Sequence, residues 1–333
     1  MKKYVAYGIG AALVDTEIKV QDEDLVLMNV DKGMMTLVDE ARQAQLLAHL
    51  QGHLVKASHA SGGSAGNSMI ATAQFGAATF MSCKVASDAD GDIYLADLEA
   101  AGVDHCLNGE RAAGTTGKCL VLITADAERS MNTFLGISET LSPAQLDPAA
   151  IAASQYLYVE GYLVTSPTGL AAAVEAVEIA RSRGVKTSLS FSDPGMVEYF
   201  REGMASIVGD GLDLIFCNEA EALGWGETDN LEVAIEKLKR AARTFVITRG
   251  AEGALTYDGE ALVEIPPHRV HAVDSNGAGD MFAGAFLYAL NRGEDFPTAG
   301  RFASLAAGRI VANYGPRLPA ADYPALRAEF FGD

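Results

Sequence analysis

Short runs rich in Val, Ile and aromatic residues alternate along this chain with longer segments in which apolar residues recur every three or four positions. The first pattern is typical of buried strands and the second of helices with one apolar face. Strands are predicted at residues 3–9, 54–58, 79–82, 103–106, 155–159, 186–191, 212–217, 244–248 and 254–257. Helices are predicted at residues 40–51, 68–75, 93–101, 169–183, 219–223, 231–242 and 298–314. This alternation predicts an α/β protein with a mostly parallel sheet.

Two segments interrupt the alternation of strands and helices. One holds short extended pieces separated by acidic residues, and the other reads as a β-hairpin. We expect the two to form one small sheet that projects from the main domain and covers a site. The predicted domains are a main α/β domain of residues 1–15, 40–112 and 137–333 and a small β lid of residues 16–39 and 113–136.

The composition supports a well-buried core and excludes some partners. At 333 residues, of which 49% are hydrophobic, the chain is long enough for one large α/β domain with an appendage. The 25 Lys and Arg against 44 Asp and Glu give a net charge of −19, which argues against a nucleic-acid or anionic-membrane surface. A protein this acidic must hold phosphate groups with a few basic residues, a metal ion or backbone N–H groups.

The cysteines and the lack of a long apolar segment bear on the compartment. The four cysteines, Cys83, Cys106, Cys119 and Cys217, show neither C-x-x-C nor zinc-type spacing, so we expect them to be reduced and buried. No N-terminal signal pattern and no run of 18 apolar residues is present, so we expect a cytoplasmic, soluble protein.

The strongest motif is V-D-S-N-G-A-G-D at residues 273–280. It follows a short extended stretch at residues 268–273 and precedes an apolar run with helical spacing, which predicts a strand-to-helix turn. Gly277 and Gly279 leave no side chain in the way of a ligand, and backbone N–H groups at the helix start can point at an anion.

Asp280 directly follows the last glycine of this motif. A carboxylate beside a bound phosphate costs energy unless it has a function. The obvious function is to accept the proton of a hydroxyl group that attacks phosphorus. The alternative is that Asp280 is only an acidic residue of the kind favoured in a first helical turn.

Two positions early in the chain suit a neutral ligand with hydroxyl groups. Asp15 follows the first predicted strand, where a carboxylate can accept hydrogen bonds from a pair of hydroxyls; the alternative is a solvated loop acid. In S-G-G-S-A-G-N, residues 61–67, Gly62 and Gly63 permit close approach to the backbone, and Asn67 offers a donor and an acceptor. The alternative is a plain loop with Asn67 at a helix start.

A glycine-containing stretch at residues 8–13 superficially resembles a dinucleotide-binding fingerprint. However, Leu13 occupies the third small position, and no strand with an acidic end follows about twenty residues later. A NAD-dependent dehydrogenase is therefore not supported.

Further positions are candidates for the phosphate and metal side of a site. Asn218 and Glu221 begin a helix after a strand and share one face of it, so they can hold a hydrated magnesium ion. The alternative is that acids at a helix start interact with the helix dipole. Thr248 and Gly250 follow the next strand and could line a nucleotide. Arg129, in the predicted lid, is the basic group best placed to reach phosphate, and otherwise is a surface arginine.

The helix predicted at residues 298–314 is rich in small residues, among them Ala303 and Ala307. A flat base can lie against such residues. Close packing of the helix on the sheet is the simpler explanation of them.

Four motifs taken together, G-G-S-A-G-N early, N-E-A-E in the middle, and V-I-T-R-G-A-E-G and D-S-N-G-A-G-D late, resemble the ribokinase-like carbohydrate and nucleoside kinases, the PfkB family. Their order and spacing cover nearly the whole chain. The resemblance implies a doubly wound sheet flanked by helices, a β lid, ATP and Mg²⁺, and transfer of the γ-phosphate to a primary hydroxyl. It leaves open whether a monovalent cation such as K⁺ binds beside the Asp274 loop, and whether the protein is a monomer or a lid-mediated homodimer.

The resemblance also implies roles for individual residues. Asp280 would be the base, and the anion hole would consist of the N–H groups of Asn276, Gly277, Ala278 and Gly279. Asn218 and Glu221 would organise magnesium through its waters. The ATP-binding residues would be Asn218, Thr248, Gly250, Gly253, Ala303 and Ala307. The acceptor would be bound by Asp15, Gly62, Gly63, Asn67 and Arg129.

Within this family the sequence is more similar to adenosine kinases than to fructokinases or ribokinases, through L-V-D ending at Asp15, N-G-A-G-D, and I-T-A-D-A-E-R-S around Arg129. This similarity implies ATP-dependent phosphorylation of the 5′-hydroxyl of adenosine, a reaction of purine salvage. The purine would lie among Met131, Thr133, Tyr162 and Leu163.

One departure from the adenosine kinase pattern is Ala11, where those enzymes usually have an Asn that would contact the nucleoside. A sugar kinase acting on a ribose- or fructose-type acceptor is therefore an alternative. A non-catalytic sensor with the same fold is a second alternative, although a sensor has no need of the Asp280 base.

Overall fold

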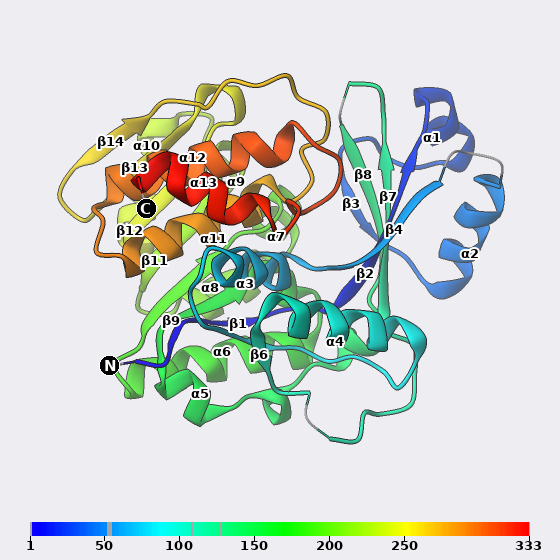
Figure 1. Cartoon of the computed structure of the whole chain (residues 1–333), viewed down its shortest axis with the longest axis horizontal. Helices are drawn as coiled ribbons and strands as arrows, with labels where there is room; N and C mark the ends of the chain where they lie inside the picture. The colour runs from blue at the N-terminus through cyan, green and yellow to red at the C-terminus, as the bar shows by residue number, and fades with distance from the viewer. Residues whose placement is uncertain (1, 52–54, 108, 127, 333) are drawn as a thin grey trace.

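The computed structural model describes residues 2–51, 55–107, 109–126 and 128–332. Within these ranges, the main sheet holds nine strands (Figure 1). In spatial order they are β14 (Leu262–Ile265), β13 (Ala254–Tyr257), β12 (Ala242–Thr248), β11 (Leu212–Asn218), β10 (Lys186–Ser190), β9 (Ser154–Glu160), β1 (Tyr4–Ile9), β5 (Thr79–Ser82) and β6 (Val103–His105). The strands from β12 to β6 pair in parallel, whereas β13 and β14 add antiparallel pairs at one edge. The predicted mostly parallel sheet is confirmed.

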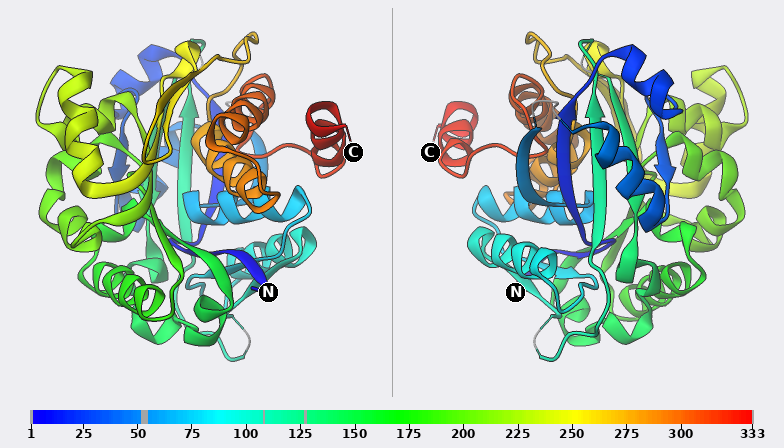
Figure 2. Two further views of the ribbon diagram at one scale, coloured as in Figure 1. Left: turned by 90° about the vertical axis from the view of Figure 1, so that its left-hand side faces the viewer. Right: turned by 90° about the vertical axis from the view of Figure 1, so that its right-hand side faces the viewer.

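Helices cover both faces of this sheet (Figure 2). One face carries α3 (Ser64–Gln74), α4 (Ala89–Ala101), α11 (Ala278–Asn291), α12 (Phe296–Val311) and α13 (Asp322–Phe331). The other carries α5 (Pro148–Ala152), α6 (Pro167–Ser182), α7 (Pro194–Tyr199), α8 (Arg201–Val208), α9 (Glu219–Gly226) and α10 (Leu231–Ala241). Short 3₁₀ helices lie in the connections: η1 (Gly136–Thr140), η2 (Pro143–Gln145), η3 (Gly161–Thr165) and η4 (Gly250–Glu252). Within the described ranges, no helix combines the length and apolarity that a membrane span requires.

The strand side chains explain why the sheet is covered twice. In β9, Tyr156 and Tyr158 pack into the core on one face, whereas Leu157 and Val159 pack into the core on the other. Alternation of side chains along a strand makes both faces apolar, so both must be covered by helices. The fold is therefore the doubly wound α/β arrangement that the resemblance implied.

A second, five-stranded sheet projects from the main domain, and we call it the lid sheet (Figure 1). Its strands in order are β3 (Met35–Leu37), β8 (Arg129–Phe134), β7 (Gly117–Ile123), β2 (Leu13–Lys19) and β4 (Val55–Gly62). Two helices, α1 (Asp22–Met28) and α2 (Glu40–His49), cover its outer face through a small apolar core that includes Leu25, Leu46 and Leu122. Its inner face, with Cys119 and Met131, lies toward the main sheet.

The lid sheet is larger than the two segments predicted for it. The strand expected at residues 54–58 is β4, which pairs antiparallel with β2 instead of joining the main sheet; Leu54 lies outside the described residues. A short strand followed by a helix looks like a βα unit in sequence, but its pairing partner is determined only in the tertiary structure. Both short extended pieces expected in the first lid segment are present, as the end of β2 and as β3. Helix α1, which was not expected, lies between them, and Gln21 and Asp24 form a capping box at its start.

The extended stretch predicted at residues 268–273 is not a strand. The last strand is β14, and an irregular segment leads from it to α11. The N–H groups of Val273 and Asp274 bond to the carbonyl of Val311 at the end of α12, so this backbone has no strand partner. The glycine motif is therefore a loop-to-helix turn, not a strand-to-helix turn.

Candidate active site

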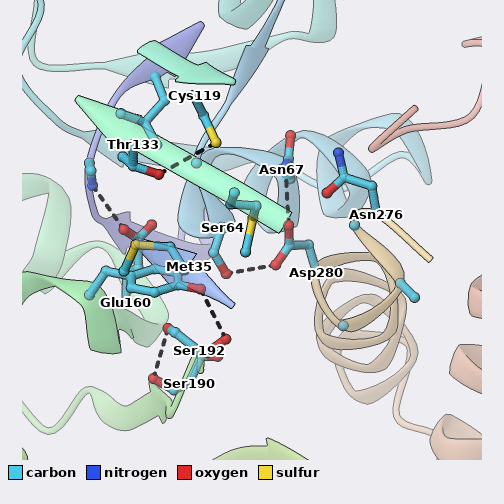
Figure 3. A pocket seen from close by; sticks show the side chains of 18 of the residues that line it. Met35, Ser64, Asn67, Cys119, Thr133, Glu160, Ser190, Ser192, Asn276 and Asp280 are labelled. Carbon is cyan, nitrogen blue, oxygen red and sulfur yellow. Dashed lines mark hydrogen bonds between the residues drawn. The ribbon is translucent and has the colours of Figure 1, made fainter. Parts of the chain in front are cut away.

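A cavity of about 300 Å³ lies between the carboxyl ends of the main-sheet strands and the inner face of the lid sheet (Figure 3). The predicted residues that line it are Asp15, Gly63, Asn67, Arg129, Met131, Thr133, Tyr162, Asn218, Glu221, Thr248, Asn276, Gly277, Ala278, Gly279 and Asp280. The carboxyl ends of parallel strands are where open α/β sheets bind ligands. The fold thus brings most of the predicted phosphate, metal and acceptor positions to one place.

Residues 274–279, which we call the anion loop, are held from within the protein. Asp274 is fully buried, and its carboxylate accepts hydrogen bonds from the N–H groups of Asn276 (2.9 Å) and Gly315 (3.0 Å). Gly277 precedes α11 with φ of 72°, and a Cβ there would lie 2.2 Å from the carbonyl oxygen of Pro316. Glycine is required at this position both for its backbone angle and for lack of space.

The four N–H groups predicted to form the anion hole are not equivalent. The N–H of Asn276 donates to Asp274, and that of Ala278 donates to the carbonyl of Ser275 at 3.3 Å. Gly277 and Gly279 remain as donors for an anion, because N–H groups in a first helical turn have no intrahelical acceptor. Apart from its chain neighbours and the nearby helix backbone, a Cβ on Gly279 would have no atom of the described residues within 4 Å, so the space beside it is open to a phosphate group.

Two lid side chains, those of Arg129 and Glu17, form hydrogen bonds with the anion loop. Arg129 donates from Nη1 to Asn276 Oδ1 at 2.8 Å and from Nε to Ser275 Oγ at 3.2 Å. Asn276 Nδ2 donates in turn to Glu17 Oε1 of β2 at 3.1 Å. The lid therefore places a guanidinium group at the loop where an anion would bind.

Asp280 is half-buried in the first turn of α11, and its carboxylate lies between two side chains of α3 (Figure 3). Oδ1 accepts a hydrogen bond from Ser64 Oγ at 2.6 Å, and Oδ2 accepts one from Asn67 Nδ2 at 3.0 Å. Burial raises the pKa of Asp280, and the two hydrogen bonds offset part of that rise. The geometry therefore fits a carboxylate that takes up a proton inside the cavity.

The side chain of Asn67 offers a hydrogen-bond acceptor to a ligand. Its Oδ1 atom is buried and has no hydrogen-bond partner among the residues that the structure describes. A buried polar atom without a partner costs free energy, so this site suits a ligand that donates a hydrogen bond, such as a hydroxyl group.

Two more carboxylates, Asp15 and Glu160, line the cavity. Asp15 is 6% exposed, and burial together with the negative charge of Glu17 raises its pKa to about 7. Glu160, at the end of β9, is 1% exposed and accepts hydrogen bonds from the N–H groups of Ala11 (3.2 Å) and Ala65 (2.8 Å). Burial raises the pKa of Glu160 to about 7 as well. Both groups can change charge near neutral pH.

Asn218 and Glu221 form a capping box at the start of α9. The N–H and Nδ2 of Asn218 donate to Glu221 Oε2 (2.9 Å) and Oε1 (2.8 Å), and Asn218 Oδ1 accepts from the Glu221 N–H at 2.8 Å. Burial raises the pKa of Glu221 to about 8. Each carboxylate oxygen keeps a further lone pair, and both residues line the cavity, so the pair fits a hydrated Mg²⁺ contacted through water.

Comparison with known proteins decides the family. A model of the pfkB family of carbohydrate kinases matches residues 29–322. The chain belongs to the pfkB family. Kinases of this family phosphorylate hydroxyl groups of sugars or nucleosides, so the protein is a phosphotransferase with an alcohol group as acceptor.

This pfkB-family kinase is similar to solved structures of two kinds. One is the adenosine kinase from Sinorhizobium meliloti, with 31% identity, a TM-score of 0.92, and coverage of 98% of this chain and 99% of that one. The other is a probable sugar kinase from Rhizobium etli CFN 42, with 31% identity, a TM-score of 0.93, and coverage of 100% and 99%. The adenosine kinase of Saccharomyces cerevisiae is 28% identical over 251 residues, which are 71% of this chain and 72% of that protein.

Six residues predicted for the site of this pfkB-family kinase lie outside the cavity lining. They are Gly62, Leu163, Gly250, Gly253, Ala303 and Ala307. Ala303 is fully buried, and Ala307 packs against the same core, so close helix packing accounts for both. Leu163 is 5% exposed and packs in the opposite core. Gly250 and Gly253 instead have positive φ at the turn around η4, where a Cβ on Gly253 would lie 2.0 Å from the carbonyl oxygen of Ile265.

Several lining residues of this kinase were not predicted. They include Glu160, Ser64, Ser190, Ser192, Met35, Leu37, Cys119, Phe216 and Phe282. Glu160 carried the same sequence signal as Asp15, because each is an acidic residue that follows a predicted strand, and it could have been found that way. The lid residues carried no local signal, since their position depends on how the lid strands pair.

Proposed function

We propose that this pfkB-family kinase transfers the γ-phosphate of ATP to the 5′-hydroxyl of adenosine, giving ADP and AMP. The observation that carries the proposal is the position of the Asp280 carboxylate. It lies one residue after the open Gly279 position, in a helix start suited to phosphate, and it faces the cavity that Asp15 also lines.

The chain's own residues supply the steps of an in-line transfer. Asp15 and Asn67 hold the ribose hydroxyls, and Asp280 accepts the proton of the attacking hydroxyl. The acceptor oxygen bonds to the γ-phosphorus as the bond from that phosphorus to the bridging oxygen of ADP breaks. The N–H groups of the anion loop and the Arg129 guanidinium stabilise the charge on the transferred group. Asn218 and Glu221 would hold hydrated magnesium, which neutralises phosphate charge when bound.

The apolar part of the cavity supports a nucleoside acceptor. Met131 and Leu37 of the lid line one side of the cavity, and Tyr162 and Phe216 of the main domain line another. The Tyr162 hydroxyl donates to the carbonyl of Ser192 at 3.3 Å, which fixes the ring. A flat base between such groups gains from stacking and from burial of apolar surface. The similarity to the Sinorhizobium meliloti adenosine kinase supports the same acceptor.

A sugar kinase is the second candidate, and Glu160 favours it. The Glu160 carboxylate lies beside Ala11, where an amide for the nucleoside was expected. A carboxylate at that place can accept hydrogen bonds from additional hydroxyl groups of a ribose- or fructose-type acceptor. The similarity to a probable sugar kinase from Rhizobium etli is compatible with this candidate.

Substitution of the base tests the proposal. Asp280→Asn keeps the shape of the side chain, but it replaces one acceptor oxygen with an NH₂ donor and cannot take up a proton. We expect kcat to fall by about 10²-fold or more, the range that general bases supply, while ATP affinity stays within a few-fold. The measurement is steady-state kinetics with adenosine, together with a titration of ATP binding.

Asp295→Asn is the matched control. Asp295 caps α12 by accepting a hydrogen bond from the Thr298 N–H at 2.8 Å, and an Asn can do the same. This variant should keep full activity. An Asp280→Asn enzyme that turns over within a few-fold of the Asp295→Asn control would refute the assignment of the base.

A further inference from the structure

Residues 315–317, which we call the back segment, lie directly behind the anion loop. The Gly315 N–H donates to Asp274 Oδ2 at 3.0 Å. The Pro316 carbonyl oxygen occupies the place that a Cβ of Gly277 would need, at 2.2 Å. A displacement of the back segment would therefore displace the loop that is proposed to bind phosphate.

Arg317 ties the back segment to two other elements. Its Nη2 donates to Asp97 Oδ2 of α4 at 2.8 Å, and its Nη1 donates to Ser61 Oγ of β4 at 3.0 Å. The Ser61 N–H donates to the same Asp97 oxygen at 2.8 Å. Burial alone would raise the pKa of Asp97, but the hydrogen bonds from Arg317 and Ser61 outweigh it and hold that pKa below its ordinary value. The Arg317 side chain is only 15% exposed, so this is a well-formed, charge-assisted junction.

The junction reaches the acceptor side through the residue after Ser61. A Cβ on Gly62 would lie 2.1 Å from Asp15 Oδ1, so the Asp15 carboxylate rests directly on the Gly62 backbone. The chain then continues through Gly63 into α3, whose Ser64 holds Asp280. One end of the Arg317 junction thus supports the anion loop, and the other supports the turn beneath the acceptor carboxylate.

We infer that Arg317 is a positioning residue that fixes the anion loop relative to the acceptor-binding carboxylate Asp15, an inference that rests on the proposed function of these two sites. Phosphoryl transfer depends mainly on alignment, and a misplacement of about 1 Å can cost about 10²-fold in rate. A guanidinium group can hold Asp97 and Ser61 at the same time in a fixed geometry, which a Lys or an uncharged side chain cannot do.

Removal of the Arg317 charge should change the pH dependence of the acceptor KM. Loss of an ion pair that only stabilises the fold would not change it. Among the described residues, the charged or titratable groups that act most strongly on Asp15 or face it are Glu17, Arg317, Asp280, Arg129 and Cys119. Arg317 and Arg129 lower the pKa of Asp15 against the effects of burial and of Glu17. Removal of the Arg317 charge should therefore raise that pKa, and the acceptor KM should begin to rise with falling pH at a higher pH than in the wild type.

Arg317→Met, Arg317→Lys and a control variant test the inference. Arg309→Met is the matched control, because the Arg309 side chain donates to both carboxylate oxygens of Glu329 (2.9 and 2.7 Å) and joins α12 to α13. Among the described residues, it forms no hydrogen bond with the back segment. We expect Arg317→Met to lose about 10- to 100-fold in kcat/KM for the acceptor, Arg317→Lys to lose less, and Arg309→Met to stay within about 2-fold of wild type. Equal kinetics for Arg317→Met and Arg309→Met would overturn the inference.

Hydrogen exchange separates this inference from the proposed function. In Arg317→Met without ligands, the amides of residues 61–67 and 273–279 should lose protection together, and in Arg309→Met they should not. Unchanged protection in both segments would overturn the inference whatever the enzyme phosphorylates. If the wild type phosphorylates neither adenosine nor ribose nor fructose, the proposed function fails. The exchange result then still decides whether Arg317 links the two segments.

Discussion

The proposed phosphate end and the proposed acceptor end of the cavity differ in how many of their polar groups are already bonded within the protein. At the phosphate end, both oxygens of Asp274 and both ends of the Asn276 amide already have partners within the protein. At the acceptor end, Asn67 Oδ1 has no partner among the described residues, and the pKa values of Asp15 and Glu160 are raised to about 7. The difference indicates that the residues proposed to bind phosphate are held in place by the protein itself, whereas a bound acceptor would supply the missing hydrogen-bond partner at the other end.

The largest expected effects come from substitution of two glycines at the proposed phosphate end. Gly277→Ala forces a side chain into a left-handed backbone with φ of 72° and against Pro316, so we expect most activity to be lost. The free energy of unfolding should fall by about 1–3 kcal/mol, the cost of such strain. Gly279→Ala places its Cβ in open space and puts an alanine in a first helical turn, so stability should not fall while ATP affinity falls by about 10-fold or more. Denaturant unfolding and ATP titration measure both effects.

Each glycine variant serves as the control for the other. A loss of ATP affinity in Gly279→Ala would point to a bound phosphate, since among the described residues no atom outside the chain neighbours and nearby helix backbone lies within 4 Å of the new methyl group. Wild-type ATP affinity in Gly279→Ala would show that the open space is not the phosphate site.

The next effect concerns the pH dependence of the acceptor end. The pKa of Asp15 is raised to about 7, so the group is ionised above this pH and neutral below it. A neutral carboxyl group is a poorer acceptor of hydroxyl hydrogen bonds, and KM for the acceptor should therefore rise as the pH falls through about 7. KM for ATP, measured in parallel, should depend less on pH.

Asp15→Asn separates Asp15 from Glu160, whose pKa is raised to the same value of about 7. This variant should show a higher acceptor KM at all pH values and a weaker pH dependence. If the pH dependence of acceptor KM is the same in Asp15→Asn and in the wild type, Asp15 does not bind the acceptor in its ionised form.

The smallest expected effect concerns the choice of acceptor. Ala11→Asn adds the amide that the adenosine kinase pattern places beside the nucleoside, next to Glu160. If the amide makes one new hydrogen bond, kcat/KM for adenosine relative to ribose should rise by about 2- to 10-fold. Ala11→Leu, similar in size but without an amide, is the control. Equal adenosine-to-ribose ratios in the two variants would mean that this position does not contact the base.

The parts of the molecule that could be predicted from sequence are those encoded by neighbouring residues. The β11–α9 and β12 segments follow from local periodicity, and the anion loop with Asp280 follows from one contiguous motif. The place of β4 in the lid sheet, the packing role of Ala303 and the junction at Arg317 depend on which distant segments meet. Residues 268–273 show most directly where prediction from sequence fails. Their composition is typical of a strand, but they form none because no partner strand from the described part of the chain lies beside them.

One measurement tests the central claim, which is phosphoryl transfer to an acceptor hydroxyl with Asp280 as the base. Purified protein, ATP and Mg²⁺ are mixed with adenosine, ribose or fructose, or with no acceptor, and the products are identified by phosphorus NMR. We predict equal amounts of ADP and AMP with adenosine, no ATP consumption without an acceptor, and almost no product from Asp280→Asn. Release of free phosphate from ATP regardless of the acceptor, or equal turnover by Asp280→Asn, would contradict the claim.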